Sequence, residues 1–245
     1  MITGTMTGEE LFLVYKKDEM KLRYFSERKA SRLTRELRKG FNTFTSACYD
    51  YKSGKANYKV CVFVDRNVKA FFYNVFIYVR DCNDYVDVSI LATDAHVEQF
   101  SYTPHCLHRY AERHLEKPDM PINNILAHVE REVAYTLVIY EDGINKVVVS
   151  SVGLFLQKRD VKRKIVVNKT FVSVGMLRTS QIVAYVKVAD ILNKFSLIFD
   201  HVKEMPKNIH EKFNEELAMR GVTRRDLYEA YGAYFKNRNK YGKND

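Results

Sequence analysis

The sequence predicts an α+β fold: antiparallel strands interrupted by a central pair of helices and followed by a helical C-terminal region. Three observations predict it. Runs rich in Val, Phe, Tyr and Ile are separated by turns too short for the crossovers that parallel strands need. Helical periodicity appears between two groups of such runs, residues 58–91 and 135–173, and returns after them. Whether these groups form one sheet or two stays open.

The N-terminal region predicts a basic amphipathic helix. Apolar residues recur at helical spacing among cations from Leu22 to Lys39, and Gly40 follows where a helix commonly ends. The apolar run at residues 11–15 fits either a short strand or the first turn of a helix. The basic face of the helix could lie along a phosphate backbone or could be a solvated surface.

The other elements follow from periodicity, turn residues and caps. Strands are expected at 58–64, 70–80, 85–91, 135–141, 146–156 and 164–173, with a densely charged, exposed turn at 158–164. Helices are expected from Pro104 and at 122–133, 181–202, 209–220 and 224–236, before a basic tail at 236–243. The predicted segments are 1–100 (helix and β meander), 101–181 (the candidate functional region) and 182–245 (C-terminal helices), or all three as one domain.

The charge and composition of the chain indicate which kinds of partner and which compartment suit the protein. Forty Lys and Arg against thirty Asp and Glu give a net charge of +10, which favours nucleic acid or anionic membrane surfaces but also serves solubility alone. Four cysteines without paired spacing indicate thiols in a reducing compartment. The absence of a signal-peptide pattern and of an apolar stretch long enough to cross a bilayer leads us to expect a cytoplasmic protein with no membrane partner.

The segment from residue 101 to 115 contains the side chains that best indicate a chemical function. Thr103 can cap the free amides of a helix, and Pro104 suits its first position. One face of this helix carries His105, His108, Arg109, Glu112, Arg113 and Glu116, and the opposite face is apolar. The polar face therefore suits anions at the positive end of the helix dipole. Alternatively, Glu112 pairs with Arg109 or His108 and neutralises it.

The pattern His105-x3-Arg109-x3-Arg113, followed by the strand-like residues 165–172 with Thr170, resembles metal-independent ribonucleases of the barnase and RelE-like toxin group. The resemblance covers residues 101–181. It implies RNA cleavage without a cofactor, with His105 as base or acid, Arg109 holding the phosphate and Thr170 adding a donor. The expected RNA-binding cations are Arg113, Lys158, Arg159, Lys162, Arg163 and Lys164.

Other chemistries receive less support. His105 and His108 lack the spacing of a helical zinc motif, so no metal site is expected. No glycine-rich phosphate loop occurs, and Cys106 falls on the apolar side of its helix. A second acid or base is not visible beside His105. The alternative function is a non-enzymatic scaffold that docks a protein partner through its C-terminal helices; the substrate and oligomeric state stay open.

Overall fold

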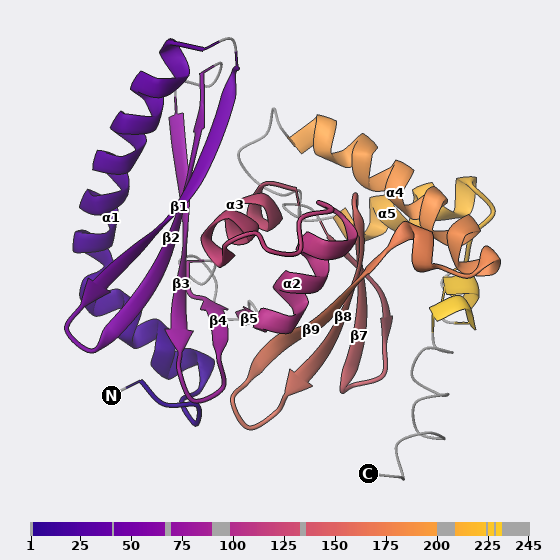
Figure 1. The fold of residues 1–245 in the computed structure, drawn as a ribbon. Helices are drawn as coiled ribbons and strands as arrows, with labels where there is room; N and C mark the ends of the chain where they lie inside the picture. Colours follow the sequence, from indigo (N-terminus) through magenta and orange to yellow (C-terminus); the bar gives the residue numbers. More distant parts are fainter. Residues whose placement is uncertain are drawn as a thin grey trace. The chain divides into compact units, whose positions relative to one another are not determined.

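The computed structural model describes residues 2–40, 42–66, 70–89, 99–132, 136–199, 209–223, 225–227 and 229–231 (Figure 1). The fold is α+β with mostly antiparallel strands, as predicted. The chain forms two compact units: Met1–Arg131 with Arg159–Thr170, and Glu132–Lys158 with Phe171–Asp245. The segments 1–100, 101–181 and 182–245 stay a prediction about domains.

In the sheet of the first unit, five antiparallel strands follow one another in chain order, and a sixth strand pairs in parallel with the last of them. Its hydrogen-bonded order is β1-β2-β3-β4-β5-β9. The strands are β1 (Phe44–Ser53), β2 (Ala56–Asp65), β3 (Ala70–Val79), β4 (Asp84–Asp87), β5 (Gln99–Tyr102) and β9 (Ile165–Ser173). Neighbours from β1 to β5 are antiparallel, whereas β5 runs parallel to β9 with Gln99 opposite Ile165.

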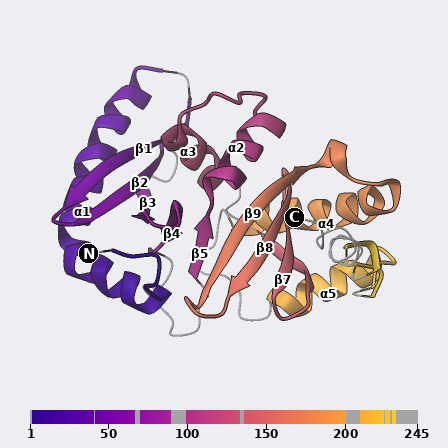
Figure 2. The same ribbon diagram turned by 60° about the horizontal axis from the view of Figure 1, so that its bottom comes forward.

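Helices cover both faces of this sheet. On one face lies α1 (Gly8–Arg38), which begins with a capping box between Thr7 and Glu10. On the other lie α2 (Pro104–Arg113) and α3 (Ile122–Glu132) (Figures 1 and 2). Adjacent residues of β2 show the alternation directly: the Tyr58 hydroxyl donates to Asp18 of α1 at 3.0 Å, and Lys59 bonds Asn123 of α3.

Residues 11–15, which the sequence left open between a strand and a helix, belong to α1 and contribute to the core of the first unit. Leu11 and Tyr15 are buried together with Leu22, Leu33 and Leu37, so they belong to one continuous helix of 31 residues. These side chains pack on valines and isoleucines of the sheet. Burial of apolar surface on this scale provides the main stabilisation of the helix, which its own propensity would not supply.

The second unit joins three antiparallel strands to helices. Its elements are β6 (Leu137–Glu141), β7 (Asn145–Ser150), β8 (Gly153–Asp160), the end of β9, the 3-10 turn Val174–Met176, α4 (Thr179–Phe199) and α5 (Ile209–Met219). The β6-β7-β8 meander is antiparallel. Its core combines Val147 and Leu154 of the strands with Tyr185, Ile191 and Phe213 of the helices.

Several expectations need correction. The single strand predicted at 146–156 is two strands joined by a tight turn, in which the Ser150 hydroxyl donates to the Gly153 carbonyl at 2.9 Å. Strand β1 was not predicted, because it is an edge strand of mixed polarity whose side chains are at most half-buried. Strand β4 ends at Asp87, earlier than expected. The predicted basic tail, residues 236–243, lies outside the described residues.

Among the described residues, no helix is both long and apolar enough to cross a membrane.

Replacing Gly153 by alanine should lower the free energy of unfolding by about 3 kcal/mol, since overpacking and backbone strain act together. The φ of Gly153 is 154°, and an added Cβ would lie 2.6 Å from both Phe171 Cζ and the Val172 carbonyl oxygen. Urea unfolding followed by circular dichroism measures the change. Gly175→Ala is the control, because its Cβ would meet nothing within 4 Å. Equal losses in the two variants would contradict the prediction.

Candidate nucleic-acid interface

Helix α2 begins as the sequence predicts. The Thr103 hydroxyl accepts a hydrogen bond from the Cys106 amide at 3.1 Å, and Pro104 occupies the first turn. The same hydroxyl lies 3.1 Å from the Asn168 carbonyl oxygen, which ties the start of α2 to β9. Cys106, Leu107, Tyr110 and Ala111 are buried, so the polar face is turned away from the core.

The predicted catalytic residues are only partly gathered. His105 is exposed in the first turn of α2, and Arg109 follows one turn later on the same face. Arg109 Nη1, however, lies 2.6 Å from Glu112 Oε2, and this hydrogen bond lowers the pKa of Glu112. Thr170 lies on β9, two residues beyond the residue paired with Tyr102. Within the described part of the chain, no hydrogen bond joins Thr170 to His105 or Arg109.

The guanidinium expected to hold a phosphate is therefore already paired with a carboxylate. This is the neutralised arrangement that the sequence left open for Glu112. Arg113, at the end of α2, is half-buried and has an interaction of its own.

The basic turn between β8 and β9 does not present its cations together. Arg163 is only 6% exposed and its Nη1 lies 2.9 Å from Asp84 Oδ2, so the expectation of an exposed turn is wrong for this residue. Burial of an unpaired guanidinium would be costly, and the ion pair of Nη1 with Asp84 offsets only part of that cost, because Nε and Nη2 are buried without a hydrogen-bond partner among the described residues. Lys164 is exposed and pairs with Glu9 at 3.0 Å. Lys162 is exposed in the turn, whereas Lys158 and Arg159, which were expected in the turn, lie at the end of β8, the first exposed and the second half-buried.

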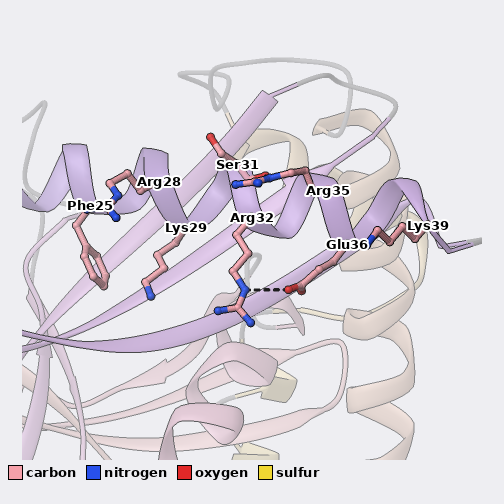
Figure 3. A pocket seen from close by; sticks show the side chains of 8 residues that line it. All are labelled: Phe25, Arg28, Lys29, Ser31, Arg32, Arg35, Glu36 and Lys39. Atoms are coloured by element: carbon pink, nitrogen blue, oxygen red, sulfur yellow. Dashed lines mark hydrogen bonds and ion pairs between the residues drawn. The ribbon is translucent and has the colours of Figure 1, made fainter.

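A shallow groove of about 690 Å3 lies along the second half of α1 and gathers more cations than α2 does. Figure 3 shows the side chains that line it. They are Phe25, Arg28, Lys29, Ser31, Arg32, Arg35, Glu36 and Lys39. The cations recur at spacings of three, four and seven residues, which places them along one side of the helix. We call this set of residues the α1 groove.

Most of the charge in the α1 groove is not neutralised. Arg32 Nε lies 2.9 Å from Glu36 Oε1, and Arg35 Nε donates to the Ser31 carbonyl at 3.2 Å. Arg28, Lys29, Arg35 and Lys39 have no carboxylate partner within the described residues. The groove therefore offers four cations to an anionic partner, where the polar face of α2 offers a compensated pair.

Aromatic rings fix the position of one of these cations. The Lys29 ammonium lies 5.1 Å from the centre of the Phe25 ring and 4.6 Å from that of Tyr49 on β1. Such contacts stabilise the ammonium by about 0.5–1 kcal/mol at a partly exposed site and hold the long side chain in place. An ordered cation loses less conformational entropy when it binds an anion.

The sequence contained part of the signal for this groove. It identified a basic helix from Leu22 to Lys39 without separating a phosphate-binding surface from a solvated one. Extending the helix to residue 8 fixes the buried stripe, and with it the side of α1 that faces outward. Tyr49 gave no signal, because its strand was not predicted.

A pair of carboxyl groups is enclosed on the opposite face of the sheet. Asp87 of β4 is buried and accepts hydrogen bonds from the amide and hydroxyl groups of Ser89, and Glu130 of α3 accepts one from Asn74. Burial, followed by the charge of Asp87, raises the pKa of Glu130 from 4.5 to about 8. This acid titrates near neutrality but faces the sheet. Among the described residues, no cluster of three or more His, Cys, Asp or Glu side chains could hold a metal ion.

The free energy of unfolding should fall as the pH rises from about 4.5 to 8, because the folded chain holds a proton on Glu130 that the unfolded chain releases. This stabilisation is complete below pH 4.5 and is lost as the pH passes the folded pKa. Glu130→Gln should reduce the fall by about 2 kcal/mol, less than the full shift implies, since Glu130 keeps some accessible surface. Urea unfolding at several pH values measures it, with the exposed Glu116→Gln as control. An unchanged pH profile in Glu130→Gln would rule this out.

Comparison with known proteins adds no relative. No family model matches the chain, and neither a curated protein nor a solved structure matches it.

Proposed function

We propose that the protein binds nucleic acid, RNA in the first place, by its phosphate backbone. The observation that supports this most is the α1 groove, where four cations that have no carboxylate partner among the described residues line one side of a packed helix. The net charge of +10 is consistent with such a partner. Cleavage of RNA is a second and more specific hypothesis. It has less support than binding, because the Arg109–Glu112 ion pair leaves less uncompensated charge on α2.

The dimensions of the α1 groove fit a nucleic-acid strand. At a rise of about 1.5 Å per residue, the helix from Arg28 to Lys39 spans about 16 Å. A stacked strand carries one phosphate per about 3.4 Å, so roughly five phosphates would lie along this distance. Arginine donates two hydrogen bonds to one phosphate, and lysine acts as a point charge. The groove therefore supports contacts to the backbone rather than reading of bases.

Binding of single-stranded RNA should weaken with salt at a slope of about −3 in log K against log salt concentration, as four phosphate contacts require. The double variant Arg28→Glu, Arg35→Glu should bind at least about tenfold more weakly, with a slope smaller by about 1.4. Fluorescence anisotropy over a series of salt concentrations measures both quantities.

The matched control is Lys52→Glu, Lys55→Glu, which makes the same change in net charge on exposed residues at the turn between β1 and β2. Beyond about 10 Å, charges are largely screened at 0.1 M salt, so this variant should bind as the wild type does. Equal losses in the two double variants would assign binding to net charge instead of the groove. No RNA binding at low salt would favour the scaffold function.

The narrower hypothesis of cleavage keeps one supporting observation, the exposed imidazole of His105 one turn before Arg109. If it is right, single-stranded RNA is cut in EDTA, because a general base and cations suffice for this reaction. His105→Ala should then lower the rate at least about a hundredfold, while the control His108→Ala keeps it. Gel analysis of labelled RNA measures cleavage. RNA that stays intact at high protein concentration excludes the ribonuclease and leaves binding unaffected.

A further inference from the structure

Two thiols face each other across the first hairpin of the sheet. Cys48 of β1 is the direct partner of Cys61 of β2 in the antiparallel register, and both are free cysteines. Opposed residues of antiparallel strands have Cα atoms about 4.5–5.5 Å apart, and a disulfide spans about 4.4–6.8 Å. The register therefore places the two cysteines within the Cα separation that a disulfide spans.

We propose that Cys48 and Cys61 are a redox modification site, at which a peroxide converts the two thiols into a reversible cross-strand disulfide. The inference does not depend on nucleic-acid binding, since it rests on the register of β1 and β2 alone. In compartments that keep thiols reduced, disulfides are usually transient and sense oxidants.

The different exposure of the two cysteines gives them different roles. Cys48 is half-buried on the edge strand β1, so a small oxidant can reach its sulfur. Cys61 is 0% exposed, and burial raises the pKa of its thiol, an effect that Cys48, Glu130 and Asp87 increase. A buried thiol of high pKa reacts slowly with an external oxidant. Cys48 is therefore the sulfur oxidised first.

The chemistry balances in two steps. The Cys48 thiolate attacks one oxygen of hydrogen peroxide, which breaks the O–O bond and gives a sulfenic acid and, with a proton, water. The Cys61 sulfur then attacks the Cys48 sulfur, its proton leaves with the sulfenic hydroxyl as a second water, and the S–S bond forms. In total, two thiols lose two hydrogens and one peroxide becomes two waters. Fixed proximity compensates for the low thiolate fraction of Cys61, because the attack is intramolecular.

The other two cysteines serve as internal controls. Cys106 is fully buried in α2, and burial raises the pKa of its thiol. Cys82 is half-buried in the turn after β3, where its thiol donates to the Val79 carbonyl at 3.8 Å. In the register of the described strands, neither stands opposite another cysteine.

The test treats the full-length protein with hydrogen peroxide, blocks remaining thiols in denaturant, and digests it for mass spectrometry without reductant. We expect one linked pair of peptides, containing Cys48 and Cys61, with the mass of the two minus two hydrogens. Dithiothreitol should restore both thiols. Cys61→Ser should instead accumulate a Cys48 sulfenic acid that dimedone traps, whereas Cys48→Ser should leave Cys61 reduced. A variant with Cys82→Ser and Cys106→Ser should form the link as the wild type does.

Three results would overturn the proposal. The first is alkylation of both cysteines after peroxide treatment, and the second is oxidation of Cys48 to a sulfinic acid while Cys61 stays a thiol. The third is a link that forms between chains, seen as a dimer on a non-reducing gel. RNA binding by the reduced protein is measured separately, so failure of one proposal leaves the other standing.

Discussion

The packing of α1 on the sheet of the first unit is the constraint on which the proposed interface depends. Leu11, Tyr15, Leu22, Leu33 and Leu37 are buried along almost the whole length of the helix. Because an α-helix repeats every 3.6 residues, this buried stripe fixes the direction in which each of the remaining side chains of the helix points. The cations of the α1 groove face outward for this reason, on a helix that cannot rotate without exposing its core residues. Their arrangement is thus a product of hydrophobic packing rather than of attraction among charged groups, which repel one another.

Arg163 and Lys164 of the β8–β9 turn differ from the cations of the α1 groove, because both have carboxylate partners. The Arg163 carbonyl accepts a hydrogen bond from the Gly8 amide at 2.8 Å, and Lys164 pairs with Glu9 in the same first turn of α1. Glycine at position 8 leaves room for the Gln99 side chain, whose amide oxygen would lie 2.0 Å from an added Cβ and would have to move. The turn is therefore held against the beginning of α1, and its arginine contributes to the fold. Carboxylates within reach, rather than the number of cations, separate these residues from the α1 groove.

Local signals in the sequence located most of the helices, although not the first half of α1, and were insufficient for several strands. Thr103 and Pro104 mark the start of α2 because a cap acts on the next three residues, and such information is entirely local. Strand β1 and the parallel pairing of β5 with β9 depend on partners far along the chain. The same holds for charged residues. The spacing of three residues between Arg109 and Glu112 is that of an ion pair within one helix, so this pair could be considered from the sequence. Arg163 and Asp84 are 79 residues apart, so nothing in the sequence indicated that Arg163 is buried. Thr170 was assigned by resemblance alone, and its role stays a prediction.

The first unit is discontinuous, because β9 returns to it after the chain has built the meander of the second unit. Ile165 and Val167 belong to the same core as Leu11 and Val86. During synthesis, residues 1–131 leave the ribosome without the strand that pairs with β5, so this core is completed only once residue 170 has emerged. A gene truncated after residue 131 would accordingly encode an unfinished sheet with an unpaired β5 edge, a form that invites aggregation or chaperone binding.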